Sequence, residues 1–368
     1  MTAGTGETRR RLRVAIVGLG FGERVLVPAF RSDPRCEIAG VCARREDRAR
    51  EAAARLGVPR AFASWRDAIA HPGVDALAIA TPPAAQPEIA LAAIRAGRHV
   101  FCEKPLATCE AEAAALRDAA AEAGVAGMID FEFPEIPAWQ RARELVASGR
   151  LGPLREVVVS WHSETRASRQ IALRRARGGP PGAADDETPD WKTQPAAGGG
   201  ALNAFASHCF HYLEWLLPPV RALWTPPFAG DAADSLVLLA LELADGTHAT
   251  VSIGTAAFLG DGHAITCYGE AGTLRLANRT DDLGTGFELA LGTRGAGALE
   301  RVPVAPLAPI GDDGRVPLVA RLVQRFADWA LEGTPARPDL SDGVRVQALL
   351  DAAWRARRAP HSGAVRRI

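Results

Sequence analysis

Residues 96–107 read AGRHVFCEKPLA, a short apolar run that ends in Glu-Lys-Pro. The apolar run at 100–102 is long enough for a buried strand. Pro105 lacks the N–H that a sheet ladder needs and holds Lys104 extended, so the strand stops with a lysine at its carboxyl end. In an open α/β sheet, ligands bind at that edge. A lysine among apolar neighbours can have its pKa lowered enough to exchange protons, although a surface lysine at a strand end would give the same pattern.

A glycine-rich turn follows the first predicted strand of the chain. Residues 13–18 form a short segment rich in β-branched side chains, which predicts a buried parallel strand. A helical pattern begins after the sequence GLGFG at 18–22. Gly18 permits the tight turn, Gly20 lets the backbone approach a pyrophosphate, and the helix N-terminus offers its N–H groups. Glu23 stands where the third glycine of the usual motif would be. The residues predicted to contact a dinucleotide here are Gly18, Gly20, Phe21 and Gly22.

Strands and helices alternate through the first part of the chain. Further apolar strands are predicted at 37–43, 75–80, 100–102 and 125–131, with helical segments between them. This alternation is typical of a doubly wound parallel sheet, the Rossmann arrangement. Two of the strands end at Thr81-Pro82 and at Glu103-Lys104. Because the carboxyl ends of parallel strands share one edge, these four residues are also predicted to contact the cofactor.

The choice between NAD and NADP depends on the end of the second strand. An acidic residue is expected there to hold the ribose 2′-hydroxyl of NAD, but Arg44 and Arg45 occupy the place. Two arginines suit a 2′-phosphate, which favours NADP over NAD. The alternative is that they simply begin the alanine-rich helix predicted at 46–56, in solvent.

Length and composition set the class of protein. A chain of 368 residues exceeds what one core usually supports, which predicts two domains. Lys+Arg and Asp+Glu are equal at 43 each, so no global charge favours nucleic acid or an anionic membrane. The apolar runs are all shorter than the roughly 20 residues that span a bilayer. The 6 cysteines are scattered without metal-ligand spacing, which predicts reduced thiols in a cytoplasmic protein and no metal site.

The second half has a different pattern. Residues 163–197 are rich in Arg, Gly, Pro and Asp, which predicts a long loop or lid. A triple glycine at 198–200 precedes a helix at 201–217. Successive strands with Gly-containing turns then predict an antiparallel sheet, and helices at 318–331 and 342–357 are expected to close this second domain. A sheet with one uncovered face needs a partner, so a homodimer or homotetramer is expected.

Five segments give the chain a resemblance to a known family. They are residues 14–22 (VAIVGLGFG), 75–83 (DALAIATPP), 96–106 (AGRHVFCEKPL), 198–202 (GGGAL) and 342–353 (DGVRVQALLDAA). Together they resemble the glucose–fructose oxidoreductase / inositol dehydrogenase (Gfo/Idh/MocA) family. The resemblance implies a Rossmann domain at 1–132 and an α+β domain at 133–368 with a large, mostly antiparallel open sheet. It also implies NAD(P)-dependent chemistry at an oxygen-bearing carbon of sugars and polyols.

The resemblance also implies site residues in the second half. The family's helix carries an aspartate and, four residues later, a histidine that the aspartate can orient. Here His208 occupies the histidine position, but Ala204 stands at the aspartate position, and Asn203 is one residue too early to share that face. His211 can share a face with His208. Trp191 and Lys192 resemble a pair found near the substrate cleft in some members; the substrate-binding residues expected are therefore Lys104, Trp191, Lys192, Asn203, His208 and His211.

Two further positions depart from the family pattern. Many relatives have a histidine where Gln86 stands, and similar sequences often have an arginine where Pro134 stands. These exchanges suggest an unusual substrate among the small molecules that the family uses.

The hypothesis favoured by these patterns is an NAD(P)-dependent oxidoreductase. Hydride would pass between nicotinamide and a carbonyl, hydroxyl or imine carbon of a sugar-like or specialised substrate. Lys104 would act as general acid/base, with His208 beside the reacting atom. Two alternatives stay open: a non-redox glycosidase or lyase that recycles a bound NAD, and a cofactor-binding sensor or assembly subunit whose catalytic pair has decayed.

Overall fold

The computed structural model describes residues 11–176, 191–226, 234–358 and 366–368. Its first sheet has six parallel strands in the order β3-β2-β1-β4-β5-β6. The strands are β1 (Leu12–Val17), β2 (Cys36–Cys42), β3 (Ala61–Phe62), β4 (Ala76–Ile79), β5 (His99–Cys102) and β6 (Gly127–Ile129). This is the doubly wound order, so the predicted Rossmann sheet is confirmed.

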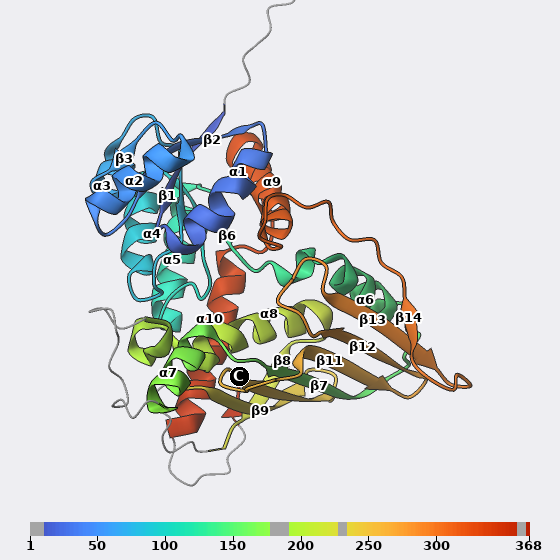
Figure 1. The fold of residues 1–368 in the computed structure, drawn as a ribbon. Coiled ribbons are helices and arrows are strands. Elements are labelled where there is room, and N and C mark those ends of the chain that lie inside the picture. Colours follow the sequence, from blue (N-terminus) through green and yellow to red (C-terminus); the bar gives the residue numbers. More distant parts are fainter. Residues whose placement is uncertain (1–10, 177–190, 227–233, 359–365) are drawn as a thin grey trace, which may run out of the picture.

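Helices join these strands and cover both faces of the sheet (Figure 1). They are η1 (Gly22–Leu26), α1 (Val27–Ser32), α2 (Glu46–Leu56), α3 (Trp65–Ala70), α4 (Gln86–Arg95) and α5 (Glu110–Ala123). The first of them, η1, is a π-helical turn directly after the glycine turn. Gly57 ends α2 and Gly124 ends α5, both in the left-handed conformation that a C-terminal cap requires.

The second sheet has nine strands in the order β14-β13-β12-β11-β7-β10-β9-β8-β15. Every neighbouring pair is antiparallel except β7 and β10, which are parallel. The bounds are β7 (Leu154–His162), β8 (Val220–Trp224), β9 (Leu236–Leu243), β10 (His248–Gly254), β11 (Gly262–Gly269), β12 (Gly272–Asn278), β13 (Phe287–Thr293), β14 (Glu300–Val302) and β15 (Arg366–Arg367). Burial alternates along β9 and β12, so one face lies on the core and the other stays open.

The remaining helices all follow β6 in the chain. They are η2 (Phe133–Glu135), α6 (Pro137–Ala147), α7 (Arg166–Ala176), η3 (Trp191–Thr193), η4 (Pro195–Ala197), η5 (Leu202–Ala206), α8 (Ser207–Leu216), α9 (Val316–Glu332) and α10 (Leu340–Arg358). The prediction of a loop over 163–197 was therefore wrong at both ends, where α7, η3 and η4 form. Residues 177–190 of that prediction lie outside the described residues.

The position of the helix α9 differs from the expected division of the chain. The helix α9 was expected to close the second domain, but it packs beside α1 on the Rossmann sheet (Figure 1). The ring of Phe326 lies 6.2 Å from that of Phe30 and 5.6 Å from that of Phe101, both edge-to-face. Glu135 of η2 also pairs with Arg321 and Arg325 of α9. The apolar stripe of α9 thus completes a core that the first 132 residues leave open.

Candidate active site

Lys104 lies at the carboxyl edge of the Rossmann sheet, directly after β5. Its Nζ donates a hydrogen bond to the carbonyl oxygen of Ala204 in η5, 2.9 Å away. Its backbone N–H donates to the Glu103 carboxylate. Desolvation lowers the pKa of Lys104, and the charge of Lys192 lowers it further, while Glu103, Glu132 and Asp130 act in the opposite direction. The lysine thus joins the two domains at one point and is more easily deprotonated than a surface lysine.

Gln86 fixes the backbone on which Lys104 stands. Its Nε2 donates to the carbonyl oxygens of Glu103 (2.6 Å), Pro105 (3.1 Å) and Leu106 (3.2 Å), and the residue is fully buried. The sequence suggested that Gln86 reflects an unusual substrate. In the structure this amide instead holds the lysine loop in place.

Replacing Gln86 with leucine is expected to lower both stability and turnover. The change leaves three buried carbonyls without their donor, which costs about 1–3 kcal/mol, and it frees the loop that positions Lys104. Thermal unfolding and kcat with a sugar substrate measure the two effects. Gln347→Leu is the matched control, because this buried amide donates its hydrogen bond to Asp351 within α10. Equal losses of kcat in both variants would contradict the positioning role.

Three carboxyl groups lie near the lysine, and the sequence motifs indicated a role for only one of them, Glu103. Glu103 follows β5, and Asp130 and Glu132 follow β6. Burial raises the pKa of Glu103 to about 7, and it raises the pKa of Asp130 and of Glu132 as well. A hydrogen bond with Glu103 helps to keep Asp130 protonated. The alternation in residues 129–133, IDFEF, was the available signal for two acidic side chains at this sheet edge.

His208 faces this acidic edge from the second domain. Its Nδ1 lies 3.9 Å from Oε2 of Glu132, and each side chain is only 7% exposed. The ring packs against Phe133, with centroids 4.9 Å apart. Burial lowers the pKa of His208 well below its usual value, and the charge of Lys104 lowers it further. The imidazole is therefore neutral at physiological pH, with a carboxylate close to one ring nitrogen.

The helix carrying His208 begins at the triple glycine. A Cβ on Gly198 would meet Pro83 at 2.4 Å, and one on Gly199 would meet the backbone of Trp191 at 2.2 Å. A Cβ on Gly200 would lie 2.6 Å from the carboxylate of Asp234, which accepts a hydrogen bond from the backbone N–H of Leu202. The glycines therefore allow the end of the Rossmann sheet, η3 and the start of this helix to approach one another.

The other residues expected at the substrate site have differing surroundings. Lys192 is exposed, and it lies close enough to Lys104 for its charge to lower the pKa of Lys104. Trp191 is half-buried in η3. The ring of His211 stacks on Phe131 at 4.1 Å, and burial lowers its pKa to about 3. The amide of Asn203 donates to the carbonyl of Gly199 and accepts from the indole of Trp354, so both its groups serve the fold.

The glycine turn fits a dinucleotide. Gly18 has φ +97°, and a Cβ there would lie 2.3 Å from the carbonyl oxygen of Ala80, so β1 and β4 meet closely at the turn. A Cβ on Gly20 would meet nothing within 4 Å, which leaves open space beside the backbone. The hydroxyl of Thr81 is buried without a partner at the same edge, beside Pro82. Open space and an unpaired donor are what a bound pyrophosphate and its riboses require.

The arginines after β2 are both exposed. Arg45 pairs with Asp47 in the first turn of α2, which agrees with the alternative that these arginines begin the helix in solvent. Arg44 precedes it at the strand end. The pair is therefore compatible with either nucleotide.

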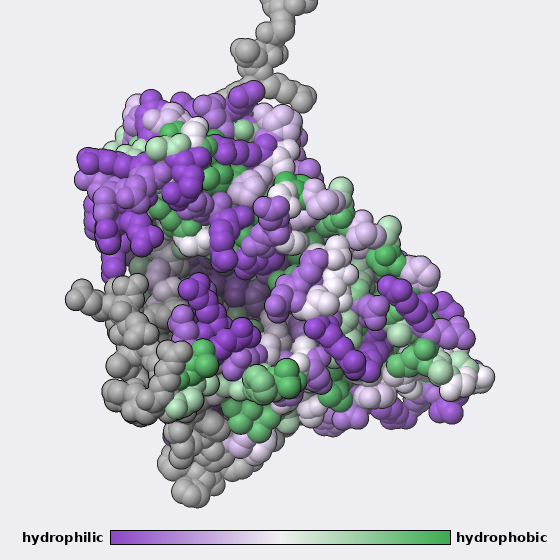
Figure 2. All heavy atoms as spheres, viewed as in Figure 1, coloured by the Kyte–Doolittle hydropathy of each residue, from purple (hydrophilic) through white to green (hydrophobic). Residues whose placement is uncertain are grey.

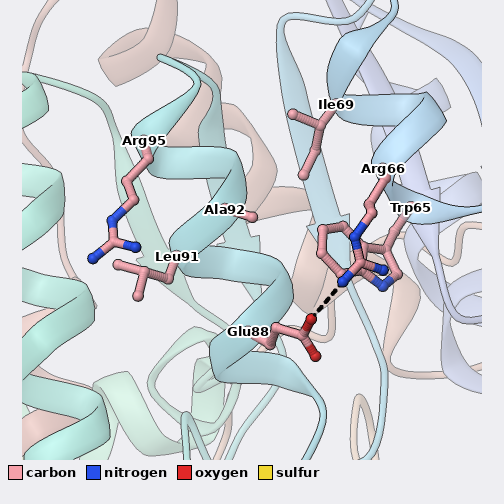
Figure 3. A pocket seen from close by; sticks show the side chains of 7 residues that line it. All are labelled: Trp65, Arg66, Ile69, Glu88, Leu91, Ala92 and Arg95. Atoms are coloured by element: carbon pink, nitrogen blue, oxygen red, sulfur yellow. Dashed lines mark hydrogen bonds and ion pairs between the residues drawn. The ribbon is translucent and has the colours of Figure 1, made fainter.

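The described part of the surface has several hollows, of which two are shown in the figures. One of about 1000 Å³ is bordered by Arg24 of η1 and by loops 281–285 and 306–315, with Arg315 stacked over the Phe21 ring at 5.0 Å. Figure 2 shows the surface hollowed between the two lobes, with hydrophilic residues along the border. The other, about 410 Å³, lies between α3 and α4, where Arg66 covers Trp65 and pairs with Glu88 (Figure 3). The first adjoins the helical turn η1 that follows the glycine turn, through Arg24.

These features define a class of protein. A doubly wound sheet with a glycine turn, and a desolvated lysine and a neutral histidine at its carboxyl edge, belong to a dinucleotide-binding oxidoreductase. Over the described ranges, three or more His, Cys, Asp or Glu residues are nowhere grouped to hold a metal ion. Each helix in those ranges is too short or too polar to cross a membrane.

Comparison with known proteins identifies the family. Residues 12–131 match the model described as an oxidoreductase family with an NAD-binding Rossmann fold, and residues 139–275 match the GFO/IDH/MocA C-terminal domain. The chain belongs to the Gfo/Idh/MocA family of oxidoreductases, as its sequence motifs suggested. Its cofactor is NAD or NADP.

Individual relatives agree with this assignment. An uncharacterized oxidoreductase of Synechocystis sp., sll0816, is 31% identical, and the match covers 96% of each chain. Levoglucosan dehydrogenase of Pseudarthrobacter phenanthrenivorans is 28% identical over 62% of this chain and 58% of its own length. A solved structure of levoglucosan dehydrogenase with NADH and levoglucosan has a TM-score of 0.81 at 20% identity, covering 97% of this chain and 99% of the other, and shows the same fold.

Proposed function

We propose that this oxidoreductase transfers a hydride between nicotinamide and a carbonyl or hydroxyl carbon of a sugar-like substrate, with Lys104 as general acid/base. The observation that carries the proposal is the position of the lysine: its amine lies between the domains, 2.9 Å from Ala204, within the acidic cluster of Glu103, Asp130 and Glu132. An intact lysine in this setting also favours an enzyme over a sensor with a decayed site.

The chain's own groups supply the proton chemistry. A dinucleotide held at the glycine turn would supply or accept the hydride. Lys104 gives a proton to the substrate oxygen in the reductive direction and takes it in the oxidative direction. The neutral imidazole of His208 accepts or donates a hydrogen bond to the same oxygen, which holds the reacting carbon in place. The carboxyl groups around Lys104 stabilise its cationic form between turnovers.

A sugar or anhydro sugar is the substrate class we propose. The polar residues between the domains, among them Lys192 and the acidic cluster, suit hydroxyl groups, and a structural neighbour binds levoglucosan. Levoglucosan and D-xylose are therefore the first probes, with imine and keto sugars following if both fail.

For the nucleotide, we propose NADP as the preferred form, since two arginines stand at the end of β2 and no acidic residue does. Fluorescence titration with NADH and NADPH tests both the class and the preference. The double variant Arg44→Ala/Arg45→Ala is expected to weaken NADPH binding about 10-fold or more, the loss of charge-assisted phosphate contacts, and to leave NADH binding nearly unchanged. Equal affinities for the two nucleotides in the native chain would remove the NADP preference, and binding of neither would overturn the proposed function.

We also propose that the chain forms a homodimer or homotetramer through the open face of its second sheet. The strand register places Trp224, Leu238 and Tyr268 on that one face, and all three are exposed. Large exposed apolar side chains on one sheet face are typical of an interface. A monomeric mass in light scattering at micromolar concentration would contradict this arrangement.

A further inference from the structure

One member of the acidic cluster, Glu132, lies beside His208 of the other domain. Glu132 leaves the end of β6 in the Rossmann domain, and His208 lies on α8 in the second domain. Oε2 of Glu132 and Nδ1 of His208 are 3.9 Å apart, and each side chain is only 7% exposed. The Nδ1 atom is buried and has no hydrogen-bond partner. A buried nitrogen with no partner is costly unless a nearby acceptor can reach it.

We propose that Glu132 is the carboxylate that orients His208. It accepts the Nδ1–H of the neutral imidazole and thereby leaves Nε2 as the acceptor that faces the substrate hydroxyl. The rate effect of this contact rests on the function proposed above, whereas the contact itself does not. Catalytic hydrogen bonds are often long before the substrate binds, so a separation of 3.9 Å in the chain without ligands is compatible with this role.

The other acidic groups are less suited to this role. Glu103 and Asp130 act on each other's pKa, and neither has an ion pair with a ring nitrogen of His208 as Glu132 does. On the helix itself, the position four residues before His208 is Ala204, which has no acceptor in its side chain and whose carbonyl already binds Lys104. Glu132 thus supplies from the first domain a group that the helix lacks.

Charged groups face both members of the pair. Burial raises the pKa of Glu132 and the charge of Asp313 adds to this, while the charges of Lys104 and Arg315 act in the opposite direction. His208 is faced by Lys104, His211, His263 and Arg315, and each of these adds to burial in lowering its pKa. A neutral imidazole carries a single N–H, so the acceptor beside Nδ1 decides which tautomer forms.

The tautomer can be measured without substrate or cofactor, by NMR of the full chain with 15N-labelled histidine and a His208→Asn variant for assignment. In the native chain at pH 7, His208 is expected to show the Nδ1–H tautomer. Glu132→Leu removes the acceptor and is expected to abolish that preference, while Glu132→Gln keeps an oxygen acceptor and retains it. The native chain showing the Nε2–H form, or the two variants behaving alike, would overturn the proposal.

A control variant separates positioning from general damage to the fold. Glu135 is a buried carboxylate three residues further on, paired with Arg321 and Arg325 and remote from His208 in its contacts. Glu135→Gln is expected to lower thermal stability but to leave the His208 signals unchanged. Glu132→Leu removes one buried carboxyl group and leaves Lys104 and Arg315 in place, so it is also expected to lower thermal stability. A shift of the His208 signals in both variants would show that the effect is not specific to Glu132.

Turnover gives the second readout. Glu132→Leu is expected to lower kcat about 10- to 100-fold with unchanged NADH affinity, the range seen when a metal-ligating histidine loses the carboxylate that orients it. Its charge also raises the pKa of Lys104, so the lysine limb of the pH profile is expected to move to lower pH in this variant. Native kcat and an unmoved limb would overturn the proposal. Absence of turnover in the native chain would instead overturn the proposed function, and the tautomer experiment would still decide the role of Glu132.

Discussion

Replacing Lys104 with methionine is expected to lower kcat about 10²- to 10⁴-fold, the range that a general acid/base contributes. The amine lies at the junction of β5 with η5, where it holds the carbonyl of Ala204 and faces three carboxyl groups. Burial lowers the pKa of Lys104, so its base form becomes available at lower pH than in a surface lysine. Oxidation of the substrate is therefore expected to rise with pH through this pKa, and reduction to fall.

A second variant separates proton transfer from charge. Lys104→Arg keeps the positive charge among the carboxyl groups but does not release a proton at any working pH. It is expected to bind NADH as the native chain does and to turn over as slowly as Lys104→Met. Rates within 10-fold of native in Lys104→Arg would assign the lysine an electrostatic role instead. Stopped-flow measurement of nicotinamide absorbance gives both the hydride step and the steady rate.

Adding one methyl group at Gly18 is expected to abolish dinucleotide binding and to destabilise the fold by about 2–5 kcal/mol. The residue has φ +97°, and the new Cβ would lie 2.3 Å from the carbonyl oxygen of Ala80. Neither backbone can move without disturbing the pairing of β1 with β4. Chemical denaturation followed by circular dichroism, together with an NADH titration, measures the two losses.

The same methyl group at Gly20 serves as the control. No atom lies within 4 Å of a Cβ built there, so Gly20→Ala is expected to have the same unfolding temperature as the native chain. It should nevertheless weaken NADH binding, because the methyl group would occupy space that the pyrophosphate needs. Native affinity in Gly20→Ala would show that the cofactor does not follow this turn.

The sequence predicted best where local patterns and packing agree. The strand at 99–102, its proline stop and the lysine after it follow from a few adjacent residues, and the structure confirms the strand and its place in the sheet. The glycine turn is equally local. Both depend on backbone rules that hold whatever packs around them.

The contacts between distant segments could not be predicted in this way. The absence of an acidic residue at Ala204 indicated that His208 lacks a carboxylate partner, yet Glu132 lies beside it, from a segment 76 positions earlier by their numbers in the chain. Gln86 was linked to the substrate, but it binds backbone carbonyls from 17 to 20 residues away. Side chains that meet only after two domains pack leave no periodic signal in either segment.

The return of α9 to the Rossmann sheet has a consequence for how the molecule folds and evolves. A polypeptide that ended after β6 would expose Phe30 and Phe101 to water, since Phe326 of α9 covers them. The nucleotide-binding half is therefore not a module that can be excised or exchanged at its apparent border. The chain has to be completed before its first sheet is fully covered, and both halves are expected to lose their structure in a single cooperative transition.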